Sequence, residues 1–66
     1  MTIHVNGEAV DLDASSTLGS VVDARVSDRR GVAAAVNGAV VPRNAWDSTE
    51  LHEGARVEIV GAVQGG

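Results

Sequence analysis

The sequence predicts a two-layer α+β domain in which a mixed sheet of about five strands packs against one helix. Two Asn-Gly dipeptides, at residues 6–7 and 37–38, each separate two short β-type runs, which is a strong signal for a β-hairpin. Between the two hairpins, residues 18–26 place apolar side chains at helical spacing. A final alternating run, residues 55–60, has no hairpin partner and must join the sheet from a distance.

Length and composition restrict the kinds of protein that this chain can be. A chain of 66 residues buries only about 60% of the surface that its unfolded form exposes, so nearly every apolar side chain is needed for one core. The absence of cysteine excludes disulfides, thiolate metal sites and thiol nucleophiles, and the two histidines lack the spacing of a zinc site. We therefore expect a single domain that binds no metal and is not an enzyme.

Nine acidic residues stand against five arginines and no lysine, which gives a net charge of −4. An acidic surface repels phosphate backbones, and a single tryptophan provides no platform for stacking bases, so no nucleic-acid partner is expected. No apolar run approaches the ~20 residues that span a bilayer, and the first residues lack the pattern of a secretory signal. The chain is therefore expected in the cytoplasm, with no membrane partner.

The first predicted hairpin comprises residues 2–5 and 8–12, which alternate between apolar and polar side chains. The side chains expected to face the core are those of Ile3, Val5, Val10 and Leu12. His4 falls on the opposite face, where a histidine is more often solvated than functional.

The predicted helix follows a turn-forming cluster, in which Ser16 or Thr17 is suited to accept hydrogen bonds from the first free backbone N–H groups. Its apolar stripe consists of Leu18, Val21 and Val22, completed by Val26 or by the aliphatic stem of Arg25. One glycine and several valines lower the intrinsic helix propensity, so packing must stabilise this helix. We expect it to end near residues 27–28, with Arg29 and Arg30 complementing its C-terminal dipole.

The second predicted hairpin joins residues 32–36 to residues 39–41. Residues 32–36 are apolar throughout, which indicates a strand covered on both faces or one whose outer face binds a partner. Pro42 follows the second strand, and because proline cannot donate to a β-ladder, this strand belongs at an edge of the sheet.

Residues 43–49 are expected to form a 3₁₀ turn or a short loop, with Trp46 packed over the core and not against a ligand. Leu51 is expected to be buried and Gly54 to lie in a turn.

The run over residues 55–60 points Val57 and Ile59 inward. A long alternating strand suits the centre of a sheet, so we place this strand beside residues 2–5 and parallel to them. That topology is the β-grasp fold.

The domain is expected to occupy residues 1–60, followed by a flexible tail over residues 61–66. The tail has no charged side chain and three glycines, which lose more conformational freedom on ordering than other residues. Six extended residues reach about 20 Å, far enough to enter the cleft of another protein. Gly65 and Gly66 leave the terminal carboxylate with no Cβ nearby, so a narrow channel can admit it. The alternative is an ordinary frayed terminus.

An ordered set of short motifs extends over essentially the whole chain. They are Val5-Asn6-Gly7-Glu8, Ala35-Val36-Asn37-Gly38, Val40-Val41-Pro42-Arg43, Trp46, the Glu53-Gly54 turn, Val57-Glu58-Ile59-Val60 and Ala62-Val63-Gln64-Gly65-Gly66. In this order they resemble the sulfur carrier proteins of thiamine thiazole synthesis. Ubiquitin and the small subunit of molybdopterin synthase are relatives that share the fold and the diglycine end.

The resemblance implies a cofactor-free carrier with a ubiquitin-like fold, not an enzyme. An adenylyltransferase of the ubiquitin-activating type would use ATP to adenylate the carboxylate of Gly66. A cysteine desulfurase or a rhodanese-like donor would then supply a persulfide, leaving a thiocarboxylate from which a thiazole synthase takes the sulfur. Val63, Gln64 and Gly65 would thread through the partner's active site.

Two positions depart from the pattern of this family: Ala55 stands where an aspartate is common, and Gly61 where a larger residue is usual. They leave the choice of partner open and do not bear on Gly66. Three alternatives stay open: a carrier for molybdopterin or cysteine synthesis, a ubiquitin-like modifier of other proteins, and a plain interaction module with a glycine-rich end.

Partners are expected to dock on the sheet face opposite the helix. If residues 32–36 alternate, Ala33 and Ala35 lie outward beside Val60, on a smooth surface that exposes apolar atoms. Glu58 points outward on the strand of residues 55–60, and together with Glu53, which lies nearby in sequence, it is able to attract basic groups of a partner. The alternative is a central strand whose alanines fit beneath loops.

Overall fold

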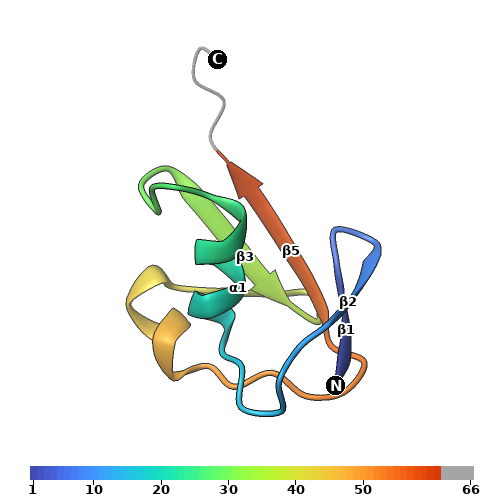
Figure 1. The fold of residues 1–66 in the computed structure, drawn as a ribbon. Helices are drawn as coiled ribbons and strands as arrows, with labels where there is room; N and C mark the ends of the chain where they lie inside the picture. The colour runs from blue at the N-terminus through green and yellow to red at the C-terminus, as the bar shows by residue number, and fades with distance from the viewer. Residues whose placement is uncertain (62–66) are drawn as a thin grey trace.

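The computed structural model describes residues 1–61, in which one helix and one 3₁₀ helix accompany a sheet of five strands (Figure 1). In chain order the elements are β1 (Thr2–Val5), β2 (Glu8–Asp11), α1 (Leu18–Arg25), β3 (Val32–Val36), β4 (Ala39–Val41), η1 (Arg43–Ser48) and β5 (Arg56–Gly61). α1 lies across one face of the sheet, so the predicted two-layer α+β class is confirmed.

The strand order in the sheet is β2-β1-β5-β3-β4, with β5 in the centre. β5 runs parallel to β1 and antiparallel to β3, while the β1–β2 and β3–β4 pairs are antiparallel hairpins. This is the predicted β-grasp topology. β4 lies at an edge, where Pro42 breaks no hydrogen-bond ladder.

Both Asn-Gly turns adopt the backbone conformation that their sequence requires. Asn6 and Asn37 each have φ 51°, and the glycines that follow them each have φ 86°. Two successive positive φ angles are typical of the type I′ turn, whose twist matches that of the flanking strands. The turn chemistry therefore sets the register of both hairpins.

The core lies between α1, η1 and the inner face of the sheet. Its buried residues are Ile3, Val5, Leu18, Val21, Val22, Ala34, Trp46, Leu51, Ala55, Val57 and Ile59. Val10 and Leu12, which were predicted to face inward, are only half-buried, because the edge strand β2 has a neighbour on one side alone. No polar or charged side chain of the described residues is buried.

Trp46 fills the core from η1, as predicted, and is only 1% exposed. Its indole N–H donates a hydrogen bond to the carbonyl oxygen of Val41, with an N···O distance of 2.8 Å. A buried indole needs such a partner, because an unpaired N–H group in an apolar environment is costly. The predicted burial of Leu51 and the turn at Gly54 are also confirmed.

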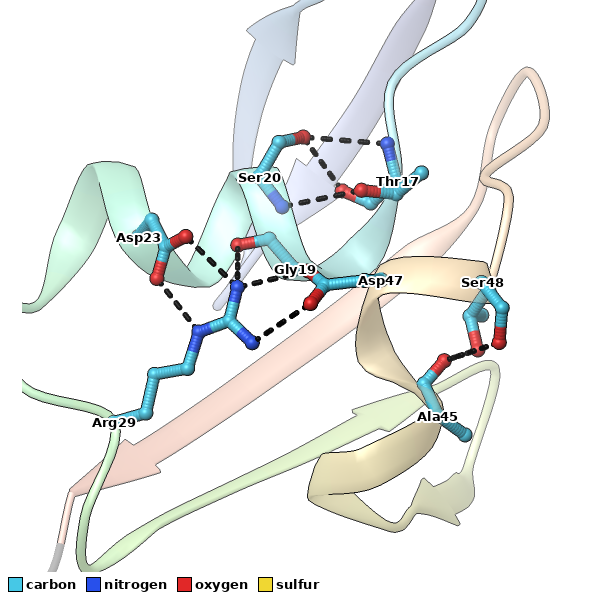
Figure 2. Close-up of polar contacts among 9 residues, drawn as sticks. Thr17, Gly19, Ser20, Asp23, Arg29, Ala45, Asp47 and Ser48 are labelled. Carbon is cyan, nitrogen blue, oxygen red and sulfur yellow. Dashed lines mark hydrogen bonds and ion pairs between the residues drawn. The ribbon is translucent and has the colours of Figure 1, made fainter.

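α1 begins with Thr17 as its N-cap, one of the two residues predicted for that position. The Thr17 hydroxyl accepts a hydrogen bond from the Ser20 backbone N–H, and the Ser20 hydroxyl accepts one from the Thr17 backbone N–H (Figure 2). Both N···O distances are 3.2 Å. This reciprocal arrangement satisfies two donors that have no partner within the helix.

α1 ends at Arg25, earlier than the predicted end near residues 27–28. Val26 caps the helix in an extended conformation, with φ −130° and ψ 150°, while its N–H still donates to the Val22 carbonyl. A β-branched residue loses side-chain freedom in a helix, and Val26 also packs against the core from this extended backbone. The extended backbone of Val26 therefore ends the helix and lets this side chain pack against the core.

The prediction that Arg29 and Arg30 complement the end of α1 is wrong, because both guanidinium groups bind carboxylates instead. Nε of Arg29 donates to Oδ1 of Asp23 at 2.8 Å, and Nη2 donates to Oδ1 of Asp47 at 2.9 Å (Figure 2). Nη2 of Arg30 donates to Oδ2 of Asp28 at 2.7 Å. The hydrogen bonds lower the pKa of all three carboxyls and raise the pKa of both arginines.

Arg29 ties α1 to η1, since Asp23 belongs to the helix and Asp47 to the 3₁₀ helix. Its guanidinium carbon also lies 5.5 Å from the centroid of the Trp46 ring, within the range of a cation–π contact. A Cβ atom at position 19 would collide with the Asp47 carboxylate. Gly19, which weakens the helix by propensity, therefore leaves room for the Asp47 carboxylate beside α1.

Candidate functional site

The face of the sheet that α1 leaves uncovered carries the four residues predicted to dock a partner. In the β3–β5 register, Ala33 lies opposite Val60 and Ala35 lies opposite Glu58. Ala33, Glu58 and Val60 are exposed, Val60 to 64%, whereas Ala35 is half-buried. Their neighbours Ala34 and Ile59 are buried, as the alternation of two strands in one register requires.

The small side chains of β3 leave a shallow hollow of about 210 Å³ on this face, which we call the apolar hollow. Its lining consists of Ala33, Ala34, Ala35, Val40, Glu58 and Val60. Val40, at 76% exposed, was not among the predicted site residues. The signal for it was present in the sequence, because a two-residue Asn-Gly turn sets Val40 opposite Ala35.

A second hollow, of about 370 Å³, lies on the same face over β1 and β5, and we call it the charged hollow. It is lined by His4, Gly7, Arg56, Val57 and Glu58. His4 and Arg56 are neighbours in the parallel register, and Glu58 borders both hollows. Neither Arg56 nor Glu58 forms an ion pair with any of residues 1–61.

The strand β5 leads from this face toward the chain end. It extends through Gly61, which pairs with Val32, and so runs one residue beyond the predicted end of the domain at residue 60. The predicted threading and sulfur-bearing residues, Val63, Gln64, Gly65 and Gly66, lie outside the described residues. By sequence they follow the central strand almost directly.

Two asparagine side chains bind the backbone of β5, a role that the sequence analysis did not assign to them. Oδ1 of Asn6 accepts a hydrogen bond from the Ile59 N–H at 2.9 Å, and its Nδ2 donates to the Ile59 carbonyl at 3.2 Å. Oδ1 of Asn37 accepts one from the Arg56 N–H at 2.9 Å. Both contacts are long-range, so no local sequence pattern indicates them.

The described residues contain few groups that are suited to catalysis. Over residues 1–61, no three His, Asp or Glu side chains gather closely enough to hold a metal ion. Asp23, Asp28 and Asp47 have a lowered pKa because arginines bind them, which is typical of structural ion pairs and not of a general acid. In the same part of the chain, no helix is long and apolar enough to cross a bilayer.

The fold and the site together define a class of protein. A β-grasp domain whose central strand is followed in sequence by Ala-Val-Gln-Gly-Gly is typical of small carrier proteins. The particular family follows from comparison with known proteins: the ThiS family model matches residues 3–66, and the chain belongs to this family. It is therefore a sulfur carrier of thiamine biosynthesis, with partners in that pathway, and not an enzyme.

Two solved structures, both from Geobacter metallireducens, are similar to the chain. The crystal structure of a thiamine biosynthesis protein (ThiS) is 30% identical, with a TM-score of 0.81 and 100% of each chain covered. The NMR solution structure of a thiamine biosynthesis protein is 32% identical, with a TM-score of 0.81, and the match covers 100% of this chain and 88% of that one. No curated protein sequence matches the chain. The resemblance inferred from the motifs is thus confirmed.

Proposed function

We propose that the terminal carboxylate of Gly66 carries the sulfur as a thiocarboxylate and delivers it to a thiazole synthase. The observation that carries the proposal is the extent of the family match, which continues through residue 66, where the sequence has Gly65-Gly66. The chain also has no cysteine on which a persulfide would form, so the sulfur needs another attachment point.

The first step activates the carboxylate. An ionised carboxylate resists nucleophiles, because its charge is shared between two oxygens and neither is a good leaving group. In an adenylyltransferase of the ubiquitin-activating type, a carboxylate oxygen of Gly66 attacks the α-phosphorus of ATP, and pyrophosphate leaves. The resulting acyl adenylate has AMP as its leaving group, so the carbonyl carbon becomes open to attack.

The second step exchanges oxygen for sulfur. The terminal sulfur of a persulfide, held on a cysteine desulfurase or a rhodanese-like donor, attacks the carbonyl carbon and AMP leaves. A second thiol of the donor system then attacks the donor cysteine sulfur of this acyl disulfide. A disulfide forms between the two thiols, and the electron pair of the broken S–S bond stays on Gly66 as a thiocarboxylate.

Docking on the uncovered sheet face would bring the chain end to the adenylating site. An apolar side chain of the adenylyltransferase would enter the apolar hollow beside Ala33, Ala35 and Val60, and a basic group would approach Glu58. The support for this surface is its exposed apolar lining, together with its position on β5, which continues into residues 62–66. The docked strand would then hold the start of the tail at a constant distance from the bound nucleotide.

The test is intact-mass measurement after incubation with ATP, the adenylyltransferase and a sulfur donor. The wild-type protein should gain the mass difference between sulfur and oxygen. A variant lacking Gly66, and one with a residue added after it, should keep the circular dichroism spectrum of the wild type and gain no mass. Sulfur incorporation by the shortened variant would refute the proposal. A thiocarboxylate that forms but gives no sulfur to thiazole synthase would show that the acceptor is wrong.

A further inference from the structure

The two neighbours of the central strand support it over different lengths. β3 stays paired with β5 up to the Val32–Gly61 pair, at the last described residue. On the other side, β1 pairs with β5 only as far as Val5–Val57, after which the chain turns away. The end of β5 that precedes residues 62–66 therefore has a complete backbone neighbour on one side only.

Beyond the last β1–β5 pair, Asn6 supplies the hydrogen bonds to β5 on the β1 side. The backbone N–H of Asn6 donates to the Val57 carbonyl at 2.8 Å, which continues the ladder by one bond. Its amide group then accepts from the Ile59 N–H and donates to the Ile59 carbonyl. A primary amide offers both a donor and an acceptor, so this one side chain satisfies the two backbone groups of Ile59 that face the β1 side.

The contact lies at Ile59, two residues before Gly61, the last residue of β5. We propose that Asn6 is a positioning residue for sulfur loading: it holds the end of β5 and so directs the chain end into the adenylating site. This inference rests on the proposed function of Gly66. In this role Asn6 takes no part in the reaction and acts only by restricting the path of β5, the strand that leads to Gly66.

The molecule contains its own control for this effect. Asn37 occupies the same position of an identical turn, with the same φ of 51°, and its Oδ1 also accepts a hydrogen bond from β5. That bond goes to the N–H of Arg56, at the beginning of the strand and far from the tail. Loss of either asparagine disturbs a hairpin and β5, but only loss of Asn6 frees the end that leads to Gly66.

The experiment compares Asn6→Gly with Asn37→Gly, because glycine keeps the positive φ and removes the side-chain amide. Steady-state adenylation by the adenylyltransferase of the pathway, with Mg·ATP and at a temperature where both variants are fully folded, gives kcat and KM for the carrier. For Asn6→Gly we expect kcat to fall about tenfold and KM to stay within about twofold, because docking is intact while the carboxylate is misplaced. For Asn37→Gly both constants should equal those of the wild type.

Amide hydrogen exchange supplies a readout that does not depend on activity. The Ile59 N–H should exchange faster in Asn6→Gly than in Asn37→Gly at equal global stability, since only the first variant removes its acceptor. Asn6→Asp is the second variant in case the glycine variant unfolds. It keeps an acceptor for the Ile59 N–H but sets a carboxylate against the Ile59 carbonyl, so kcat should fall again.

Three results would overturn the inference. Wild-type kcat in every folded Asn6 variant would show that the contact does not position the tail. Equal loss of kcat in Asn6→Gly and Asn37→Gly would show that general destabilisation is responsible. If the wild-type protein itself is not adenylated, the proposed function has failed, and the inference fails with it.

Discussion

The two sides of the sheet differ in whether their apolar side chains are buried and whether their charged side chains form ion pairs. On the side of α1 the apolar residues form the core, and three arginines bind carboxylates. The pairs are Arg25–Glu8 at 3.5 Å, Arg29–Asp23 at 2.8 Å and Arg30–Asp28 at 2.7 Å. On the uncovered face, Arg56 and Glu58 have no ion-pair partner among residues 1–61, and Val40 and Val60 are the exposed large apolar residues.

On the side of α1 the interactions stabilise the fold, whereas the side chains of the uncovered face remain available to a partner under the proposed function. A domain of this size needs most of its apolar side chains for one core, so two valines left in water beside unpaired charges are a cost to the isolated domain. An apolar centre flanked by charges is the common composition of a protein–protein interface. Variants that separate the two sides test this interpretation.

The largest effect should come from arginine substitutions at two neighbouring positions of β3, one that faces the core and one that faces outward. Ala34 is 2% exposed and faces the core, so Ala34→Arg buries a charge without a partner and should unfold a domain whose core supplies only about 3–5 kcal/mol. Ala35→Arg points outward and should change the melting temperature by less than about 4 °C. It should nonetheless lower kcat/KM for adenylation by more than about tenfold, because the arginine fills the apolar hollow.

Thermal denaturation and the adenylation assay together decide between the two sides. If Ala35→Arg also unfolds, Ala35 belongs to the core and the strand is covered on both faces. If it folds and is adenylated at the wild-type rate, partners do not use this face.

A second large effect is expected on the α1 side. Trp46→Ala removes the largest buried side chain at a cost of about 3–5 kcal/mol, which equals the stability that the core supplies, so this variant should be largely unfolded by circular dichroism. Trp46→Phe keeps an aromatic ring under Arg29 but leaves the Val41 carbonyl without its donor, so it should cost about 1–3 kcal/mol of unfolding free energy in urea denaturation. The folded Trp46→Phe molecules should be adenylated normally. A well-folded variant that is not adenylated would place Trp46 in the interface.

An intermediate effect is expected from the charge that borders both hollows. Glu58→Lys should raise KM for the adenylyltransferase about fivefold at low salt and remove most of its salt dependence, with no change in melting temperature. Glu50→Lys is the matched control, because it makes the same charge change at an exposed residue whose bridge to Thr17 lies away from this face. Equal effects of the two variants would indicate that only net charge matters.

The smallest effect concerns pH. Arg29 lowers the pKa of Asp23 and Asp47 in the folded protein below the ordinary value of 3.8, so the stability from these pairs is complete above about pH 4. It is lost as the pH falls through the lowered pKa values, because the unfolded state then binds protons first. Arg29→Gln should reduce the fall in melting temperature below about pH 4 by a few degrees. Arg56→Gln, on the uncovered face, should leave the wild-type dependence unchanged.

Local patterns in the sequence were sufficient to predict which elements form and in what order they follow one another. Alternation identified the strands, and the two Asn-Gly turns fixed both hairpins, because the φ angles they require are a property of the dipeptide itself. The central place of β5 followed from its length and its lack of a hairpin partner. The place of Ala33, Ala35, Glu58 and Val60 on the uncovered face followed from alternation alone, although Val40 was overlooked.

Contacts between distant residues were decided only in the tertiary structure. The end of α1 at Arg25 depends on where Val26 meets the core, and the ion pairs of Arg29 depend on Asp47 lying beside Gly19. The hydrogen bonds between Asn6 and Ile59 join residues 53 positions apart. The sequence determined by itself which elements form and how adjacent ones pair, since those preferences act over a few residues. Which side chains bind the central strand was decided by packing, because only the folded sheet brings residues near the start of the chain beside β5.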